Sequence, residues 1–517
     1  MSEKKQTILE WYQENQMFID APCNGMGNCG RCKVKFLSDA PVPKEKEKEL
    51  LSEAELKEGI RLACVTVMEE DLQFELLGVL VSTEQMVIPE GTDKRGSTTE
   101  NAEKIKENEP VGIAVDIGTT TLAMAVNSLV SGKCIKVMTM VNSQRTFGAD
   151  VISRIQAANQ GKGRQLQQSI LMDIWKMLQE LIVATGMKPE QIKKIVIAGN
   201  TTMCHLLLGY SCERLGSAPF VTQHNKLRKL DVKQFFAEIL PLIEEDEYYV
   251  DFFPEVIVFP AISAFVGADI VAGMYYCDMD LQEEPQMLLD IGTNGEIVIG
   301  DKKGFYVTST AAGPVFEGGN ISCGIPAVKG AIAHAVLENT EELHWNCEIL
   351  GGAAECKKAP VGICGSGLID CVAALWQEGI IDENGTLIDR FFETGVPVNQ
   401  LCITQSDIRE VQMGKAAIRA GIEVLMEKES VEKVYLAGGF GTELNIASAI
   451  TIGLLPEESR NCIISKGNTS LKGLQKFLMD KSGEERIWDI IQKSKEIVLA
   501  KEGNFEEKYI LFMQFLI

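Results

Sequence analysis

Two stretches of the chain share one pattern of apolar and polar positions. Each has an apolar run, an aspartate, a glycine with hydroxyl or amide residues, and a second apolar run. The first covers residues 114–121 and contains Asp116, and the second covers residues 288–296 and contains Asp290. The pattern predicts, in both places, a strand, a tight turn and a returning strand.

The two predicted turns have the chemistry of phosphate-binding loops. Glycine lets the backbone approach a ligand closely, and backbone N–H groups and hydroxyls can hold phosphate oxygens. A carboxylate at the strand end, such as Asp116 or Asp290, can bind Mg²⁺ or its waters. One such turn also occurs in plain hairpins, but two copies 174 residues apart (290 minus 116) are more informative. We therefore expect two related halves, each offering one phosphate loop to a cleft between them.

Other periodic segments predict the elements around these turns. Apolar residues at helical spacing predict helices over residues 7–16, 165–182 and 413–426, and a buried strand is expected at residues 195–198. The strand leads into a small polar turn, Gly199 to Met203, which either faces the cleft or is only a tight turn. A helix is expected to start near Asp269 and to run to about Tyr276. Residues 312–320 are rich in glycine, residues 362–368 are expected to be a glycine-rich helix start, and residues 435–441 are expected to be a strand that ends in glycines and opens a helix.

Composition limits the class of protein. At 517 residues the chain is long enough for about two to four domains. Its net charge of −23 makes nucleic acid an unsuitable partner, because that function favours a basic surface. No apolar run approaches the ~20 residues that span a bilayer, and the N-terminus does not resemble a signal peptide. We expect a cytoplasmic protein without membrane segments, in which most of the 15 cysteines are small core residues.

Four cysteines near the N-terminus form a separate pattern. Cys23, Cys29, Cys32 and Cys64 have the spacing C-x5-C-x2-C-x31-C. Plant-type [2Fe–2S] ferredoxins use C-x4-C-x2-C with a distant fourth cysteine, so the spacing favours a [2Fe–2S] cluster. A four-cysteine zinc site is the alternative, but zinc ribbons usually pair two C-x2-C units and only one is present.

The segments around these cysteines predict a small domain and a linker. Strand-like alternation is expected at residues 33–37 and 65–77, and the charged residues 44–58 are expected to form a solvated helix. Residues 82–110 are polar without sustained periodicity and predict a linker. Ferredoxin-like domains normally have a β-hairpin before the first helix. Here that hairpin is expected either to be absent or to precede the present start.

The motifs, taken in order, resemble the actin–sugar kinase–Hsp70 ATPase superfamily. The resemblance implies that Asp116 and Asp290 bind Mg²⁺ through water, and that Gly438 and Gly439, in the run Ala437 to Gly441, contact adenosine. It implies that Asp269 is at the position that orients water or a hydroxyl, and we take Asp269 and Glu317 as the catalytic candidates. The residues of the two phosphate loops would be Gly118, Thr119, Thr120, Gly292, Thr293 and Asn294.

With the cysteine-rich head added, the chain resembles the reductive activators of corrinoid proteins. Further matching motifs are residues 147–151, 313–318 and 453–456. The resemblance implies a mixed α/β chain with a ferredoxin-like β-grasp [2Fe–2S] domain, possibly truncated, at 1–80 and a linker at 81–110. A two-lobed ATPase of the actin, Hsp70 and sugar-kinase type (ribonuclease H-like) would follow, with lobes at 111–280 and 281–517.

The same resemblance implies a function. Such a protein uses ATP and Mg²⁺ to return an inactive Co(II) corrinoid protein of a methyltransferase system to Co(I). The implied partners are that corrinoid protein, an electron donor such as ferredoxin or flavodoxin, and a second copy of the chain in a homodimer. Two alternatives stay open: a redox-sensing ATP-binding regulator that reduces no partner, and a small-molecule kinase. The kinase fits less well, because phosphoryl transfer does not need an iron–sulfur cluster.

Overall fold

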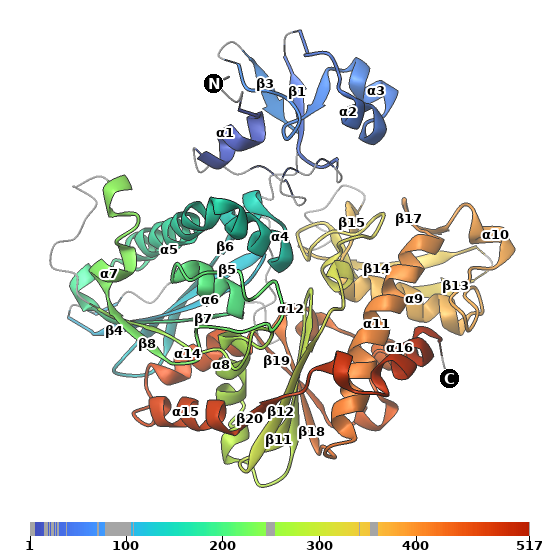
Figure 1. Ribbon diagram of the computed structural model, residues 1–517. Coiled ribbons are helices and arrows are strands. Elements are labelled where there is room, and N and C mark those ends of the chain that lie inside the picture. Colours follow the sequence, from blue (N-terminus) through green and yellow to red (C-terminus); the bar gives the residue numbers. More distant parts are fainter. Residues whose placement is uncertain are drawn as a thin grey trace. The chain divides into compact units, whose positions relative to one another are not determined.

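A computed structural model describes most of the chain: residues 6–14, 19, 21, 25, 27, 30–37, 39–69, 72–77, 105–106, 108–243, 254–340, 342–351 and 360–515. The chain divides into two compact units. The first contains the N-terminal domain and the first lobe, and the second contains the second lobe (Figure 1). The bounds of the first unit are Met1–Val81, Asn101–Asp269 and Leu474–Asp480, and those of the second are Ser82–Glu100, Ile270–Gly473 and Lys481–Ile517. The predicted linker at 81–110 lies mostly outside the described residues.

The N-terminal domain is a small sheet with three short helices. Strand β1 lies between β2 and β3 and is antiparallel to both. Its core is formed by apolar side chains from α1 and the sheet, including Ile8, Val34 and Leu62. The elements are α1 (Ile8–Glu14), β1 (Lys33–Phe36), α2 (Glu45–Leu50), α3 (Glu53–Lys57), β2 (Ile60–Leu62) and β3 (Phe74–Leu76).

The structure confirms the first helix and corrects two predictions in this domain. Of the strand expected at residues 65–77, only β3 forms among the described residues, because residues 63–65 turn away after β2. The charged segment 44–58 is two short helices, and it is not wholly solvated. Glu47 is 1% exposed, and its carboxylate accepts hydrogen bonds from Leu62 N at 2.8 Å and Thr66 Oγ1 at 3.4 Å. The carboxylate is buried where it supplies an acceptor for the backbone N–H of the last residue of β2.

The first lobe is built on a sheet of six described strands in the order β6-β5-β4-β7-β9-β8. Strands β4, β5 and β6 form an antiparallel meander, and β7 and β9 continue the sheet in parallel to β4. Nearly every residue of β4 is buried, as expected for a central strand covered on both faces. Helix α5 packs against β6 through its apolar face and ends at Gly186, whose φ of +67° permits a left-handed cap.

In chain order, the first-lobe elements begin with the first predicted phosphate hairpin. They are β4 (Val111–Ile117), β5 (Thr121–Ser128), β6 (Cys134–Val141), η2 (Ser143–Phe147), α4 (Val151–Ala157), η3 (Ala158–Lys162), α5 (Gly163–Thr185), β7 (Ile192–Gly199), α6 (Thr201–Leu207), β8 (Arg228–Asp231), α7 (Val232–Phe236), β9 (Glu255–Val258) and α8 (Ala268–Tyr276). The predicted helix at 165–182, the strand at 195–198 and the helix starting near Asp269 are confirmed.

The second lobe repeats this topology. Its main sheet has the order β19-β18-β10-β11-β12-β20, again with an antiparallel meander, β10-β11-β12, and two strands parallel to β10. In both lobes, therefore, the strand that carries the aspartate is first in the meander and pairs in parallel with a later strand. This repeated order confirms the two related halves expected from the sequence.

A smaller sheet, β14-β13-β15, and the hairpin β16-β17 complete the second lobe. Helix α11 packs against β11, β12 and α16. It begins eight residues before the predicted start at Met413 (413 minus 405). The bounds are β10 (Gln286–Ile291), β11 (Gly295–Asp301), β12 (Gly304–Thr310), η8 (Pro314–Glu317), β13 (Ala331–Asn339), β14 (His344–Ile349), β15 (Gly362–Ile363), α9 (Gly365–Gln377), α10 (Asp389–Phe392), β16 (Val396–Val398), β17 (Leu401–Ile403), α11 (Gln405–Met426), β18 (Lys433–Ala437), α12 (Gly438–Glu443), α13 (Ile446–Thr451), β19 (Ile463–Gly467), α14 (Thr469–Phe477), α15 (Gly483–Lys493), β20 (Ser494–Glu496) and α16 (Phe505–Met513).

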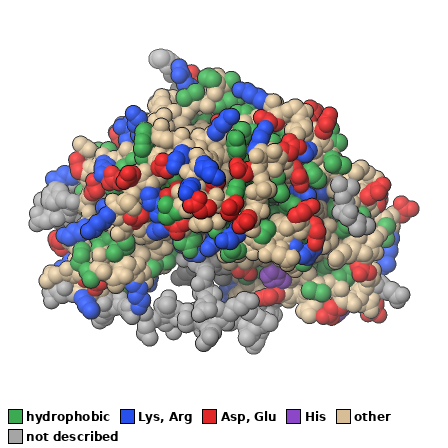
Figure 2. All heavy atoms as spheres, turned by 90° about the horizontal axis from the view of Figure 1, so that it is seen from below, with side chains coloured by type: hydrophobic (Ala, Val, Ile, Leu, Met, Phe, Trp, Pro, Cys, Tyr) green, Lys and Arg blue, Asp and Glu red, His purple; other side chains and the backbone are tan. Residues whose placement is uncertain are grey.

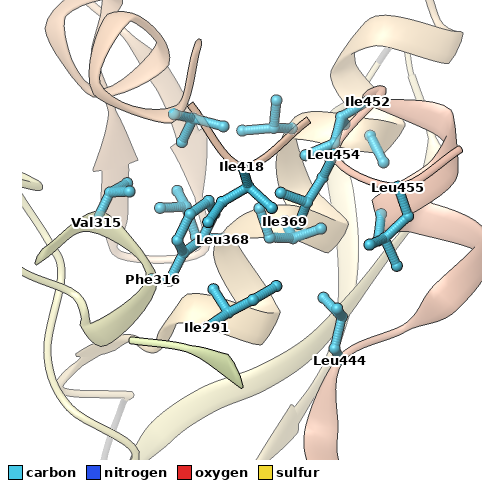
Figure 3. Close-up of a cluster of buried hydrophobic side chains, with 14 of the residues drawn as sticks. Ile291, Val315, Phe316, Leu368, Ile369, Ile418, Leu444, Ile452, Leu454 and Leu455 are labelled. Carbon is cyan, nitrogen blue, oxygen red and sulfur yellow. The ribbon is translucent and has the colours of Figure 1, made fainter. Parts of the chain in front are cut away.

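A large apolar core supports the second lobe beneath its predicted loops. Ile291, at the end of β10, is in the same buried cluster as Val315 and Phe316 of η8 and Leu368 of α9 (Figure 3). Each of these four side chains is nearly inaccessible to solvent. The turn that carries Glu317 is therefore fixed to the core by the two residues before it.

Two further observations concern the hydropathy of the helices and the charge of the surface. No helix in the described part of the chain is long and apolar enough to cross a bilayer. On the face drawn in Figure 2, Lys and Arg side chains alternate with Asp and Glu and do not form a continuous basic stripe. This face lacks the concentrated positive charge that typically binds a phosphate backbone.

Candidate functional site

The predicted cluster loop is partly described. Cys32 directly precedes β1, and Cys64 lies in the turn that follows β2. The backbone of Ala63 donates a hydrogen bond to the Cys32 carbonyl at 2.8 Å, which brings the two cysteine segments side by side. Cys23 and Cys29 lie outside the described residues, so the set of four ligands stays a prediction.

The glycines of this loop have the conformation that a tight cluster-binding loop needs. Gly25, Gly27 and Gly30 have φ values of +80°, +69° and +64°, which L side chains rarely adopt. A Cβ on Gly25 would lie 3.2 Å from Leu9 Cδ2 and 3.9 Å from Cys64 Cβ. The described part of the loop therefore folds back over α1 towards Cys64.

The first predicted phosphate loop is the turn between β4 and β5. Asp116 lies one residue before the end of β4, and the Gly118 N–H donates to the Thr121 carbonyl at 3.0 Å. A Cβ on Gly118 would lie 2.6 Å from that carbonyl oxygen, so the tight turn requires glycine. Thr119 Oγ1 accepts a hydrogen bond from Asn200 Nδ2 at 3.0 Å.

Two side chains donate hydrogen bonds to carbonyl groups of this turn. Asn142 Nδ2 donates to the Gly118 carbonyl at 2.9 Å, and Arg154 Nη2 donates to the Thr119 carbonyl at 2.5 Å. In a trans peptide the N–H group points away from the carbonyl of the same unit. The N–H groups of Thr119 and Thr120 therefore point to the opposite side of the turn, where a phosphate would be bound.

Two helices begin beside this turn. Residues 199–203, for which a polar turn was expected, are the end of β7 and the start of α6, with Asn200 as the N-cap. Helix α8 begins against the same place: a Cβ on Gly267 would lie 2.5 Å from Asn200 Cα and 2.7 Å from Asp269 Oδ1. The polar segment at 199–203 therefore contacts the phosphate loop and is more than a connection.

Asp269 lies in the first turn of α8, where the helix dipole favours a carboxylate. Burial raises the pKa of the nearby Cys204 thiol, and the charges of Asp269 and Asp116 raise it further. Both carboxylates therefore lie within electrostatic reach of one buried thiol. The first lobe thus brings together Asp116, the turn at Gly118 to Thr120, and Asp269.

The second predicted phosphate loop is the turn between β10 and β11. The Gly292 N–H donates to the Asn294 carbonyl at 2.8 Å and closes the turn. Thr293 Oγ1 donates to Glu317 Oε2 at 2.9 Å, and a Cβ on Gly292 would lie 3.3 Å from Glu317 Oε1. Glu317 is exposed and lies directly beside this loop.

The predicted adenosine turn begins beside the same aspartate. Asp290 pairs with Ala437 in the parallel register of β10 and β18, and Gly438 follows at the start of α12. Gly438 has a φ of +77°, and a Cβ there would lie 2.6 Å from Asp290 Oδ1. A Cβ on Gly439 would contact nothing within 4 Å. The second lobe therefore brings together Asp290, the turn at Gly292 to Asn294, Glu317 and Gly438.

Comparisons with known proteins cover nearly the whole chain. Residues 1–69 match the 2Fe-2S iron-sulfur cluster binding domain, residues 111–282 match the RACo middle region, and residues 284–516 match the C-terminal domain of RACo, the ASKHA domain. The chain is 31% identical to the corrinoid activation enzyme RamQ of Eubacterium limosum over 449 residues, which is 79% of this chain and 71% of that protein. The chain belongs to the family of reductive activators of corrinoid proteins.

Two further relatives agree with this assignment. The activator is 26% identical, over 77% of its length, to the [Co(II) methylated amine-specific corrinoid protein] reductase of Methanosarcina barkeri, of which 76% is covered. A solved structure described as a reductive activator for corrinoid,iron-sulfur protein superposes with a TM-score of 0.68 at 26% identity. That alignment covers 100% of this chain and 96% of the solved one.

The matches also identify the cofactors. The iron–sulfur domain indicates a [2Fe–2S] cluster, and the ASKHA domain implies ATP and Mg²⁺. The described residues of the activator fit this set. Ala63, the residue before Cys64, is hydrogen-bonded to Cys32, three glycines of the cluster loop allow tight turns, and each lobe presents a glycine turn beside an aspartate.

Two side chains of the activator's first lobe, Asn142 and Arg154, were not predicted from the sequence, and the role of the segment that contains Asn200 was left open. Asn142, Arg154 and Asn200 all hold the turn at Gly118 to Thr120. One signal could have revealed Asn200. It follows the strand that pairs with the Asp116 strand, as Gly438 follows the strand that pairs with the Asp290 strand. For Asn142 and Arg154 the sequence offers no comparable signal, because both reach the loop from separate segments.

Proposed function

We propose that the activator uses ATP to drive the one-electron reduction of an inactive Co(II) corrinoid protein to Co(I) within a methyltransferase system. The observation that carries this proposal is the joining, in one chain, of a cluster domain to two lobes with duplicated phosphate hairpins. A nucleotide clamp alone would suit a kinase, and a cluster alone would suit a simple electron carrier. Their combination suits electron transfer that depends on nucleotide.

The proposed cluster ligands are Cys23, Cys29, Cys32 and Cys64. When bound, the cluster supplies the single electron, at a potential near roughly −400 mV for plant-type sites. The buried Cys32 and the half-buried Cys64 would keep it close to the surface of the small domain, within reach of a docked partner.

The residues proposed to bind the nucleotide come from both lobes. Asp116 and Asp290 would hold the waters of Mg²⁺, and Gly438 and Gly439 would lie against adenosine. Asp269 and Glu317 are the proposed catalytic residues, because each carboxylate lies beside one phosphate loop. The phosphate oxygens would be held by the loop residues Gly118, Thr119, Thr120, Gly292, Thr293 and Asn294.

The difference between the two reduction potentials explains why ATP would be needed. We take the reduction potential of the Co(II)/Co(I) couple to lie below that of the cluster, and each 100 mV of uphill transfer costs about 2.3 kcal/mol for one electron. A ligand can shift such an equilibrium only by binding one state better than another. We propose that the ATP-bound lobes favour the complex in which the cobalt is easier to reduce, through a change in its ligation.

Several further features belong to the proposal. We expect a cytoplasmic homodimer that takes electrons from a ferredoxin or flavodoxin and binds neither nucleic acid nor membranes. The proposed domains are 1–80 for the cluster, 81–110 for the linker, and 111–280 and 281–517 for the two lobes.

The test is formation of Co(I) on a corrinoid protein, followed by absorbance with a low-potential reductant, with and without ATP. We expect reduction to require ATP in the wild type and to fall to the ATP-free level in Asp290→Asn. The matched control is Asp489→Asn, which removes a surface ion pair with Lys493. Equal rates with and without ATP in the wild type would contradict the proposal.

A further inference from the structure

Arg154 is a buried cation behind the first phosphate loop. It is 0% exposed, and burial lowers its pKa to about 9. Its acceptors are neutral: the carbonyls of Gly148 at 2.9 Å and Thr119 at 2.5 Å, Gln144 Oε1 at 3.4 Å and Met203 Sδ at 3.2 Å. Its charge is partly offset by the nearby carboxylates of Asp150 and Asp173, so its direct effect on the loop is the hydrogen bond to the Thr119 carbonyl.

The position of Arg154 determines the orientation of the loop. Because it holds the Thr119 carbonyl, the Thr120 N–H must point to the opposite, ligand side. Arg154 also fixes the segment before α4, through Gly148 and Gln144. A movement of that segment would therefore change the direction of a phosphate-binding N–H group.

The same segment is held by the cluster domain. Gln13 of α1 is 4% exposed, and its Nε2 donates to the Thr146 carbonyl at 2.7 Å. Its Oε1 accepts a hydrogen bond from Lys162 Nζ at 2.7 Å. Thr146 lies in η2, between Gln144 and Gly148. Gln13 and Arg154 therefore both form hydrogen bonds to this short segment.

Helix α1 is in turn tied to the cysteine loop. The Leu9 N–H donates to the Ala63 carbonyl at 3.0 Å, and the Ile8 N–H donates to the Thr66 carbonyl at 2.9 Å. Both acceptors flank Cys64. A continuous series of contacts therefore runs from the Cys64 turn through α1, Gln13, η2 and Arg154 to Thr119.

We propose that Arg154 is a positioning residue for the first phosphate loop, and that Gln13 couples the cluster domain to this loop through η2. This inference rests on the proposed nucleotide site. Docking of α1 at η2 stabilises the phosphate-binding orientation of the loop, and bound ATP stabilises the docked position of α1 in return, because coupling between two sites is reciprocal.

The experiment measures the ATP dissociation constant of the full chain with its cluster loaded. The variants are Gln13→Leu, Arg154→Lys and the double variant. Gln168→Leu is the matched control, because it also removes one side-chain bond to a carbonyl, that of Glu238 at 3.2 Å. We expect Gln13→Leu to weaken ATP binding about fivefold, and the control to leave it unchanged. In the Arg154→Lys background, Gln13→Leu should have no further effect, because the link is already broken.

A second measurement follows backbone hydrogen exchange in α1. ATP should slow this exchange in the wild type and not in Arg154→Lys. Equal affinities for Gln13→Leu and Gln168→Leu, or effects that simply multiply in the double variant, would overturn the coupling alone. If Arg154→Lys does not fold, the test rests on Gln13→Leu alone. That variant should bind ATP more weakly, and ATP should not slow hydrogen exchange in its helix α1. Failure of the wild type to bind ATP would instead overturn the nucleotide site, and the coupling with it.

Discussion

Thr293 Oγ1 donates a hydrogen bond to Glu317 Oε2 at 2.9 Å, and this bond joins the second phosphate loop to a glycine-rich turn 24 residues later. The turn is rigid: Val315 and Phe316 are buried, and Gly318 has a φ of +78°. The exposed Glu317 carboxylate is therefore held beside the loop, because the two residues before it pack in the core, as Figure 3 shows. This is a suitable place for a group that orients a water near a phosphate.

The first prediction concerns the charge of Glu317. Glu317→Gln keeps an oxygen that accepts from Thr293 but removes the negative charge. We expect ATP affinity to be retained, while ATP hydrolysis falls by about 10²- to 10⁴-fold, the usual contribution of a general base. The measurement is phosphate release at saturating ATP. A variant that hydrolyses ATP at the wild-type rate would show that Glu317 only supports the loop.

The second prediction compares two glycines, one inside the proposed site and one outside it. Gly438→Ala forces a side chain into a left-handed conformation, which costs about 1–2 kcal/mol, and places the new Cβ 2.6 Å from Asp290 Oδ1. We expect ATP affinity to fall by at least about tenfold. Gly503→Ala, outside the proposed nucleotide site, meets nothing within 4 Å and is the matched control. Calorimetric titration with ATP would measure both, and equal affinities for the two variants would contradict the role assigned to the Asp290–Gly438 contact.

Much of this site could be predicted from the sequence, because its parts are local. An apolar run, an aspartate and a glycine within eight residues specify a strand and its turn, and both hairpins form where expected, at β4–β5 and β10–β11. The turn proposed to contact adenosine is equally local. Its residues Gly438 and Gly439 follow a short apolar strand directly.

Residues whose role depends on distant partners could not be predicted in this way. Glu47 looks like one of many solvated charges, but it is buried because Leu62 N and Thr66 Oγ1 lie against it in the fold. Arg154 is one of several residues in an amphipathic stretch, and its partner Thr119 is 35 residues away. The segment Gly199 to Met203 was ambiguous, because only the sheet register places Asn200 beside Thr119.

The third prediction tests the cluster ligands. Cys64→Ser should remove the visible absorption and the EPR signal of the reduced cluster, and should abolish electron transfer, because a serine hydroxyl is a poor substitute for a thiolate ligand. ATP binding should persist. Cys134→Ser, on the exposed start of β6, is the control and should keep the cluster. A Cys64→Ser protein with an unchanged EPR spectrum, or a wild type that contains zinc without iron, would contradict the proposed centre.

His334 contacts two carboxylates, one of them on α12, the helix that begins at the proposed adenosine turn. Its Nδ1 lies 3.0 Å from Asp370 Oδ2, and its Nε2 lies 3.7 Å from Glu443 Oε2, at the end of α12. The hydrogen bond to Asp370 and the ion pair with Glu443 raise the pKa of His334 to about 10, with a smaller effect from the charge of Glu348. Asp370 also accepts from Ser448 Oγ at 2.6 Å. A protonated His334 therefore joins β13 and α9 to the helix that begins at Gly438.

The fourth prediction follows from the raised pKa of His334. Because the folded protein holds this proton more tightly than the unfolded chain, the contribution of His334 to stability is complete below about pH 6.5, the ordinary pKa of histidine. It is lost as the pH rises through about 10. His334→Gln should therefore be less stable than the wild type at pH 6, and the difference should shrink steadily towards pH 10 in denaturant titrations. The control is His344→Gln, whose side chain is 68% exposed beside Glu338 and should change stability little at any pH. A difference between wild type and His334→Gln that stays constant from pH 6 to 10 would show that packing, and not the charge on His334, holds α12 in place.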